Sequence, residues 1–416
     1  MRWSGLTADP NQDESEFLKH ITSARDSLID APKKAALLVH HGDADGVCAA
    51  AIVRLALGRQ GWKVEKVCLE KLFPEVLDRI HSKEVGAVIY ADLGSPHVGR
   101  ISEANQGSKL VVILDHHDPA AIQDPSILNL NPELWGINGE SEASSSTVAY
   151  LLAAELNELN EDSAPIALVG SSELPGRVVG LNRIPLEAGL KNGVAQTIRS
   201  GKGETVKVKI GDDWWNRQKA SSLITVLGSV GYYRSGPDVA IDAFTTGIGD
   251  RTRELAEQLE EERRSKFDEL FSDIRRHALK DMSLVQWIDL ENKLAGMGTK
   301  VIGTFLSILR FKRVVDPKKY LLGFMWLEPK IPELGSLVGD WTKVSARAPP
   351  VLDKAIASGT MLPLSELLRS ASDADGGFAD GHAFAASGVI PRGSETSFAE
   401  RVNNMALRLE WHTEDG

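Results

Sequence analysis

Acidic and imidazole side chains follow three apolar runs of the sequence, 35–39, 86–90 and 109–114, at the point where each run ends. These side chains are His41, Asp43, Asp45, Asp92, Asp115, His116 and His117. Several carboxylates cannot share one crevice as ions, because repulsion and desolvation would protonate some of them. Two divalent cations about 3.5–4 Å apart would remove that cost and clamp a phosphoryl group. Mixed carboxylate and imidazole ligands suit Mn²⁺, and the imidazoles make Mg²⁺ the less favoured alternative.

These residues can meet only if the apolar runs are neighbouring strands. Short apolar segments at 35–39, 63–67, 86–90 and 109–114 alternate with segments of helical pattern, which predicts an α/β fold with a parallel sheet covered by helices. The carboxyl ends of parallel strands lie along one edge of a sheet, so the acidic and imidazole groups are expected in one crevice. Two alternatives stay open: Asp92 could cap a helix, and the histidine pair could be structural.

The composition places the chain among globular proteins. It has 416 residues, a net charge of −11, 42% hydrophobic and 25% charged residues, which excludes a collagen-like, coiled-coil or largely disordered chain. The acidic balance argues against a protein that coats nucleic acid through bulk charge, although a local basic groove is compatible with it. The chain shows no apolar segment of membrane-spanning length, no secretory signal pattern and only two cysteines. We therefore expect a cytoplasmic protein without a membrane partner.

Four segments are expected along the chain. They are an N-terminal helical extension over 1–34, a metal-binding catalytic domain over 35–180, a helical connector over 181–282 and a smaller α/β domain over 283–416. The connector includes 251–280, a long charged segment with helical periodicity. In the last segment, strands are expected at 284–288, 320–326 and 342–345, and a helix at 301–310.

The motifs resemble those of the DHH family of phosphoesterases, in particular its archaeal RecJ-like type. The matching text is H-G-D-A-D-G at 41–46, Y-A-D at 90–92 and D-H-H at 115–117. The text V-S-A-R at 344–347 and G-H-A-F-A-A-S-G at 381–388 resembles the DHH-associated C-terminal domain of that family. The resemblance implies an active site in the cleft between the two domains.

The resemblance also implies a role for each site residue. The implied metal ligands are His41, Asp43, Asp45, Asp92 and His116. Asp92 would bridge two Mn²⁺ ions, His117 would contact the phosphate under attack, and Asp115 would orient its neighbours, as carboxylates behind metal-bound histidines do.

Two ligand positions are left open. His40 is a rival to His41, which we prefer because it stands two residues before Asp43. The family supplies a further Asp in a fourth motif, expected after the apolar segment 167–170, where this sequence has no Asp. Glu173 is the nearest carboxylate, so either it substitutes for that Asp or the second metal binds weakly.

The C-terminal domain is expected to hold the nucleotide end of the substrate. The implied substrate-binding residues are Arg347, Gly381 and His382. The Arg347 guanidinium can bind a phosphate through two hydrogen bonds, and the glycine-rich loop 376–382 would bring its amides close to phosphate. A surface ion pair and a plain turn are the alternatives. Basic residues at 310–313 and 318–319 could line a groove for a strand, although a solvated face explains them as well.

The predicted function is a manganese-dependent phosphodiesterase or exonuclease that hydrolyses single-stranded nucleic acid or short oligonucleotides with a water activated by two metals. One alternative is a catalytically weak or inactive scaffold with the same fold, bound to a replication or repair protein, which the missing Asp favours. Another is a phosphodiesterase that acts on cyclic dinucleotides or other small nucleotides. No residue pattern distinguishes DNA from RNA or one cleavage polarity from the other.

Overall fold

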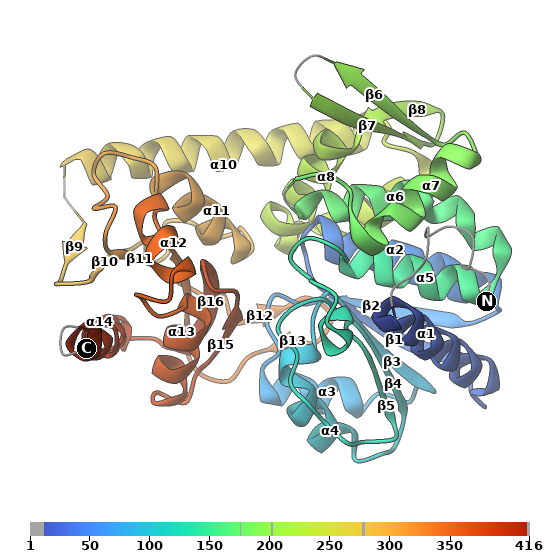
Figure 1. Ribbon diagram of the computed structural model, residues 1–416, viewed down its shortest axis with the longest axis horizontal. Coiled ribbons are helices and arrows are strands. Elements are labelled where there is room, and N and C mark those ends of the chain that lie inside the picture. Colours follow the sequence, from blue (N-terminus) through green and yellow to red (C-terminus); the bar gives the residue numbers. More distant parts are fainter. Residues whose placement is uncertain (1–11, 175, 201–202, 277–278, 414–416) are drawn as a thin grey trace. The chain divides into compact units, whose positions relative to one another are not determined.

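The computed structural model describes residues 12–174, 176–200, 203–276 and 279–413 (Figure 1). The two ends of the expected terminal segments, 1–11 and 414–416, lie outside the described residues. The chain divides into two compact units, the first up to residue 257 with 332–334, and the second formed by 258–331 and the residues from 335 onward. Among the described residues, no helix combines the length and the apolar composition needed to cross a membrane.

A five-stranded parallel sheet is the centre of the first unit. Its strands are β1 (Ala35–His40), β2 (Lys63–Cys68), β3 (Ala87–Ala91), β4 (Leu110–Leu114) and β5 (Ile127–Leu130). They lie in the order β2-β1-β3-β4-β5, and every neighbouring pair is parallel. The predicted parallel sheet is confirmed. Its central strands are continuous apolar runs because both of their faces are buried.

Helices cover both faces of this sheet (Figure 1). They are α1 (Gln12–Asp30), α2 (Ala44–Arg59), α3 (Pro74–His81), α4 (Val98–Asn105) and α5 (Ser145–Leu156). Helices α3 and α4 lie on one side, and α1, α2 and α5 lie on the other. The chain passes from β1 outward to β2 and then back across β1 to β3, so right-handed crossovers place α2 and α3 on opposite faces.

The segment between the two sheets contains strands as well as helices. Its elements are α6 (Ala164–Gly170), α7 (Arg183–Lys191), β6 (Ala195–Ser200), β7 (Gly203–Ile210), β8 (Asp213–Asn216), α8 (Arg217–Thr225), α9 (Gly236–Thr246) and α10 (Asp250–Arg276). The antiparallel sheet β6-β7-β8 was not expected in a helical connector. Its sequence signal is the alternation of buried Val206, Val208 and Ile210 with polar residues, the period of a strand with one buried face.

A six-stranded mixed sheet is the centre of the second unit, in the order β15-β16-β14-β11-β10-β9. Its strands are β9 (Lys280–Asp281), β10 (Val285–Asp289), β11 (Tyr320–Trp326), β14 (Trp341–Arg347), β15 (Phe378–Gly381) and β16 (Ala385–Pro391), and a small ribbon is formed by β12 (Lys330–Ile331) and β13 (Gly335–Ser336). The helices are α11 (Lys300–Leu309), α12 (Pro350–Ala357), α13 (Leu364–Asp373) and α14 (Glu395–Thr413). The three strands and the helix predicted over 284–345 are present.

His81 makes the stability of the first unit sensitive to acid. Its side chain is 6% exposed and lies between Asn105 Oδ1 at 3.2 Å and the Tyr90 hydroxyl at 2.9 Å. Burial lowers the pKa of His81 to about 4. An unfolded histidine titrates near ~6.5, so the contribution of neutral His81 is present above that pH and is lost as the pH falls toward 4.

The unfolding free energy of the unchanged protein should fall as the pH drops from about 6.5 to 4.5. We expect this fall to be smaller in His81→Gln, by on the order of 2 kcal/mol. Urea unfolding at a series of pH values measures this slope. His20→Gln is the matched control, because the His20 side chain is 48% exposed. The same slope in His81→Gln and the unchanged protein would contradict the assignment.

Candidate metal centre

The turn between β1 and α2 supplies the first two candidate ligands. The His41 amide donates to the Ala91 carbonyl at 3.1 Å, which ties this turn to the end of β3. Asp43 is the N-cap of α2, and its Oδ1 accepts from the Gly46 amide at 3.0 Å, while its Oδ2 lies 2.9 Å from His41 Nδ1. A Cβ at Gly46 would lie 2.6 Å from the His41 carbonyl oxygen, so only glycine lets the first turn of α2 approach His41 this closely.

Asp92 follows β3 in an uncommon backbone conformation. Its φ is 65°, in the left-handed region, which costs a non-glycine residue about 1–3 kcal/mol and occurs most often at functional sites. The carboxylate is buried between two imidazoles, with Oδ2 3.4 Å from His41 Nδ1 and Oδ1 3.4 Å from His116 Nε2. The next helical turn has Gly94 as its N-cap, so Asp92 is not the helix cap that one alternative proposed.

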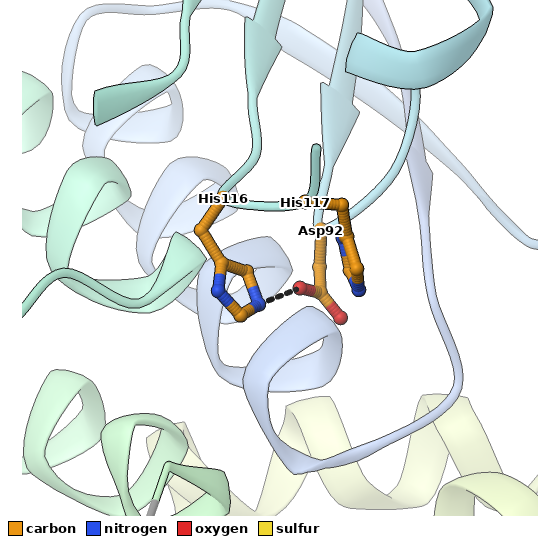
Figure 2. Close-up of side chains that lie close together, drawn as sticks. All are labelled: Asp92, His116 and His117. Carbon is orange, nitrogen blue, oxygen red and sulfur yellow. Dashed lines mark ion pairs between the residues drawn. The ribbon is translucent and has the colours of Figure 1, made fainter. Parts of the chain in front are cut away.

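His116 presents a defined nitrogen to this centre. Its Nδ1 lies 2.6 Å from the Gly139 carbonyl oxygen, which can only accept, so Nδ1 carries the hydrogen. In the neutral ring Nε2 then keeps its lone pair, and it faces Asp92 at 3.4 Å and Asp45 Oδ2 at 3.7 Å. A backbone carbonyl behind the ring is the usual arrangement for a metal-binding histidine. Figure 2 shows Asp92 between the rings of His116 and His117.

Asp115 holds the histidine pair in place through hydrogen bonds. Its Oδ1 accepts from the His116 amide at 2.8 Å and from His117 Nδ1 at 2.7 Å, and its Oδ2 accepts from the Ser95 amide at 2.9 Å. Burial acts to raise the pKa of Asp115, but the His117 imidazole and the hydrogen bonds outweigh it and lower the pKa to about 2. An ionised Asp115 thus fixes the orientation of the His117 ring through Nδ1.

Asp45 lies at the same centre but is held by a second helix. Both of its oxygens accept from the start of α5, Oδ2 from the Ser145 amide at 2.8 Å and Oδ1 from the Ser146 amide at 2.9 Å. Burial and the carboxylate of Asp92 raise the pKa of Asp45 to about 6. Its distance of 3.7 Å to His116 keeps it beside the candidate ligands.

Ser145 is a site residue that the sequence interpretation missed. Its hydroxyl donates to Asp92 Oδ1 at 2.9 Å, while its amide holds Asp45. The available signal was the serine run 144–146 at the start of a predicted helix, where serine is a common N-cap. Gly170 permits this arrangement, because a Cβ there would lie 2.8 Å from Asp45 Oδ1.

Two groups of side chains bring their ligand atoms within 4.8 Å of one another. One triad is His41, Asp43 and Asp92, and the other is Asp92, His116 and His117. Asp92 belongs to both triads, as expected for a residue that bridges two ions. Among the described residues, neither triad includes Asp45, His40 or Glu173.

The donor set fits a divalent cation. His41 Nδ1 is buried and, among the described residues, has no well-formed hydrogen bond, although Asp43 Oδ2 lies 2.9 Å away. A buried polar atom without a hydrogen-bond partner calls for a missing ligand. Burial alone would lower the pKa of His41, but the carboxylates of Asp43 and Asp92 outweigh it and raise the pKa to about 9. This negative potential is what a cation would neutralise.

His40 and Glu173 have other contacts. His40 Nδ1 lies 2.8 Å from the His41 carbonyl oxygen, and burial lowers the pKa of His40 to about 4. Glu173 ends the short 3₁₀ helix η4 (Ser171–Glu173) and accepts from the Thr225 hydroxyl at 2.5 Å. The preference for His41 over His40 agrees with this geometry. A role for Glu173 as the replacement ligand stays a prediction.

In the second unit, Arg347 ends β14 as a partly buried cation. Its Nε donates to the Ser307 hydroxyl at 2.9 Å, and its Nη1 donates to the Ser345 hydroxyl at 3.2 Å and to the Ala346 carbonyl at 2.8 Å. In the described part of the chain, no carboxylate forms an ion pair with Arg347, so the alternative of a surface ion pair is not supported. Burial and the charge of Arg310 lower the pKa of Arg347 to about 10.

The open glycine loop expected over 376–382 is not present. Residues Phe378–Gly381 form the edge strand β15, antiparallel to β16, and the His382 amide donates to the Ala385 carbonyl at 2.8 Å. Gly381 has φ 140°, and a Cβ there would lie 2.5 Å from Ala386 Cα. Gly381 therefore serves the close pairing of two strands. The roles of Gly381 and His382 in substrate binding, like the cleft between the domains, stay predictions.

Comparison with known proteins agrees with this geometry. Residues 35–171 match the family model described as DHH family, N-terminal domain. The matched residues are about a third of the chain. An uncharacterized protein of Methanocaldococcus jannaschii is 32% identical over 139 residues, which are 32% of this chain and 31% of the relative. The match thus spans about a third of the length of that curated relative.

Solved structures share the fold well beyond the DHH domain. RecJ from Thermus thermophilus in complex with Mn²⁺ has a TM-score of 0.63 and 17% identity, covering 97% of this chain and 56% of that one. CDC45 from Entamoeba histolytica has a TM-score of 0.58 and 11% identity, covering 94% of this chain and 98% of that one. The chain therefore has a RecJ-like fold. Its acidic and imidazole cluster is compatible with a divalent metal.

Proposed function

We propose that the chain is a manganese-dependent phosphodiesterase that hydrolyses single-stranded nucleic acid or short oligonucleotides as an exonuclease. The observation that carries this proposal is the pair of triads that share Asp92 at the carboxyl edge of a parallel sheet. The DHH domain and the Mn²⁺ in the similar RecJ structure support it.

The proposed roles follow the contacts of each side chain. His41, Asp43 and Asp92 would hold one ion, and Asp92 with His116 would hold the other, with Asp45 beside them. The bound ions would supply an activated water and neutralise charge on the phosphoryl group. Asp115 orients His117 through the 2.7 Å bond to Nδ1, and His117 would contact the substrate phosphate through Nε2.

The second unit would bind the nucleotide end of the substrate. Arg347 supports this role, because it is a partly buried guanidinium held by hydroxyl and carbonyl oxygens, with no counter-ion among the described residues. A buried cation without a charged partner is costly, and a phosphate would relieve that cost. Gly381 and His382 would complete this subsite.

Two other functions remain as candidates. A weakly active or inactive scaffold that binds a replication or repair protein is favoured by Glu173, which is hydrogen-bonded to Thr225 at the position where a fourth Asp was expected. A phosphodiesterase acting on cyclic dinucleotides or other small nucleotides would use the same metal chemistry, with Mg²⁺ as the alternative ion. It would differ in the length of the substrate.

A substrate panel with Mn²⁺ tests the proposal. The purified chain is incubated with end-labelled single-stranded DNA and RNA, a linear dinucleotide and a cyclic dinucleotide, and product length is scored over time. We expect stepwise release of mononucleotides that stops with a chelator and is abolished in Asp92→Ala and His116→Ala. Equal activity in both variants would reject the assigned site. Binding of Mn²⁺ without hydrolysis of any substrate would favour the scaffold.

A further inference from the structure

The loop between α11 and β11, residues 310–319, exposes an aromatic ring. Phe311 is 65% exposed, although phenylalanines elsewhere in the same unit, such as Phe305 and Phe324, are fully buried. A single exposed apolar side chain is common on protein surfaces. What sets Phe311 apart is the set of charges around it.

The loop is strongly basic in a chain of net charge −11, with five Lys or Arg residues and one Asp between 310 and 319. Three of these cations, Lys312, Arg313 and Lys318, are exposed, and none of them forms an ion pair in the described part of the chain. The single acid, Asp316, accepts from the backbone amide of Lys318 at 2.9 Å. The loop therefore presents net positive charge to solvent.

The other two cations of the loop are engaged within the unit. Lys319 Nζ lies 2.7 and 2.8 Å from the oxygens of Asp281, and Arg310 Nη1 lies 3.6 Å from Asp353 Oδ2. Lys319 and Arg310 thus form ion pairs with carboxylates of the same unit. The three unpaired cations are left for a partner of opposite charge.

Two cation–ring contacts order this surface. The Arg310 guanidinium lies 4.8 Å from the centroid of the Phe311 ring, and the Lys312 ammonium lies 5.1 Å from the centroid of Phe271 on α10. Such contacts hold the long side chains in place near the aromatic rings. The Phe311 ring thus lies beside the restrained cation of Arg310, and its neighbour Lys312 is restrained by Phe271.

The same surface is connected to Arg347 along α11. Arg347 Nε donates to the hydroxyl of Ser307 at 2.9 Å, and Arg310 follows Ser307 by about one helical turn. Arg310 is also near enough for its charge to lower the pKa of Arg347, after the larger effect of burial. Cationic groups therefore extend from the partly buried Arg347 to the exposed loop.

We propose that Phe311, Lys312, Arg313 and Lys318, here called the Phe311 patch, bind single-stranded nucleic acid. A base would stack on the Phe311 ring, and backbone phosphates would contact the three unpaired cations, the combination that single-strand binding surfaces use without sequence preference. The inference rests on the proposed function and deepens it, because it assigns a track for the part of a strand that lies beyond the hydrolysed end.

Binding is measured by fluorescence anisotropy of a labelled 20-nucleotide single strand, with the full chain and a chelator present so that no hydrolysis occurs. Phe311→Ala should weaken binding by ~10-fold, and Phe311→Trp should retain it, since stacking depends on the ring. Val338→Ala is the matched control, because Val338 is 73% exposed in the same unit and lies outside the patch. The triple variant Lys312→Gln, Arg313→Gln, Lys318→Gln should reduce the slope of log affinity against log salt by ~2.

Hydrolysis of a dinucleotide separates this inference from the proposed function. The proposed track holds the part of a strand beyond the hydrolysed end, so a dinucleotide is not expected to use the patch, and the Phe311→Ala variant should cleave it at the unchanged rate. The inference is overturned if the single strand does not bind to the chain. It is also overturned if the strand binds with equal affinity to the wild type, to Phe311→Ala and to the triple variant. Both results hold whatever substrate the enzyme hydrolyses. Binding of an acidic peptide in place of the strand would also overturn it. Patch-dependent binding without any hydrolysis would sustain the inference and reject the proposed function.

Discussion

Asp92→Asn is expected to lower kcat for metal-dependent hydrolysis by ~10³-fold or more, because several kcal/mol of charge stabilisation depend on bound metal. Asp92 belongs to both triads, so the loss of its charge weakens both ion positions at once. Asparagine is the sharper replacement than alanine. It accepts the left-handed φ of 65° almost as readily as aspartate, whereas alanine would add backbone strain to the lost charge.

Titration calorimetry with Mn²⁺ and thermal unfolding with and without Mn²⁺ provide the measurements. The unchanged chain should bind two ions and gain stability from them, since a ligand that binds only the folded state stabilises it. Asp92→Asn should bind one ion or none. Asp242→Asn is the control, because Asp242 forms a surface ion pair with Arg54, 2.6 Å away, in the same unit. Two bound ions and a wild-type rate in Asp92→Asn would contradict the shared-ligand assignment.

The predictable parts of the fold are the strands that are buried on both faces of the sheet. The runs 35–39, 86–90 and 109–114 are continuous apolar strands, and covering helices leave no other environment for them. Strand β5 is four residues long and contains the half-buried Asn129, so it carries no such run. Strands β6 to β8 alternate over short lengths among helices, and their pairing is set by contacts that are distant in sequence.

The candidate site was predictable where it depends on strand ends and not where it depends on packing between helices. The convergence of Asp92 and His116 follows from the order of parallel strands. The hydrogen bond from the start of α5 to Asp45 does not follow from strand order. It requires the start of a helix 100 residues away to lie against the first turn of α2. Gly381 illustrates the opposite error: glycine suggested a loop, while the structure needs it for close strand pairing.

Asp115→Asn is expected to reduce both stability and rate while leaving metal binding largely intact. The Asp115 carboxylate accepts from the Ser95 amide, the His116 amide and His117 Nδ1, so every side-chain oxygen faces a donor. An asparagine side chain must place its NH₂ group against one of these donors, at a cost of about 1–3 kcal/mol for the unsatisfied buried groups. The His117 ring also loses its charged partner, and kcat should fall by ~10- to 100-fold, the usual cost of losing such a partner.

The pH dependence distinguishes this role from simple structural damage. Since the pKa of Asp115 is lowered to about 2, its contribution to stability is present above the unfolded value near ~3.8 and is lost as the pH falls toward 2. Acid unfolding of Asp115→Asn should therefore be less steep below about pH 4. Urea unfolding, calorimetry with Mn²⁺ and rate measurements on Asp115→Asn, His117→Gln and the double variant complete the test. If Asp115 acts through His117, the two rate losses overlap and do not add. Additive losses, or loss of both ions in Asp115→Asn as in Asp92→Asn, would show that Asp115 acts on the metals instead.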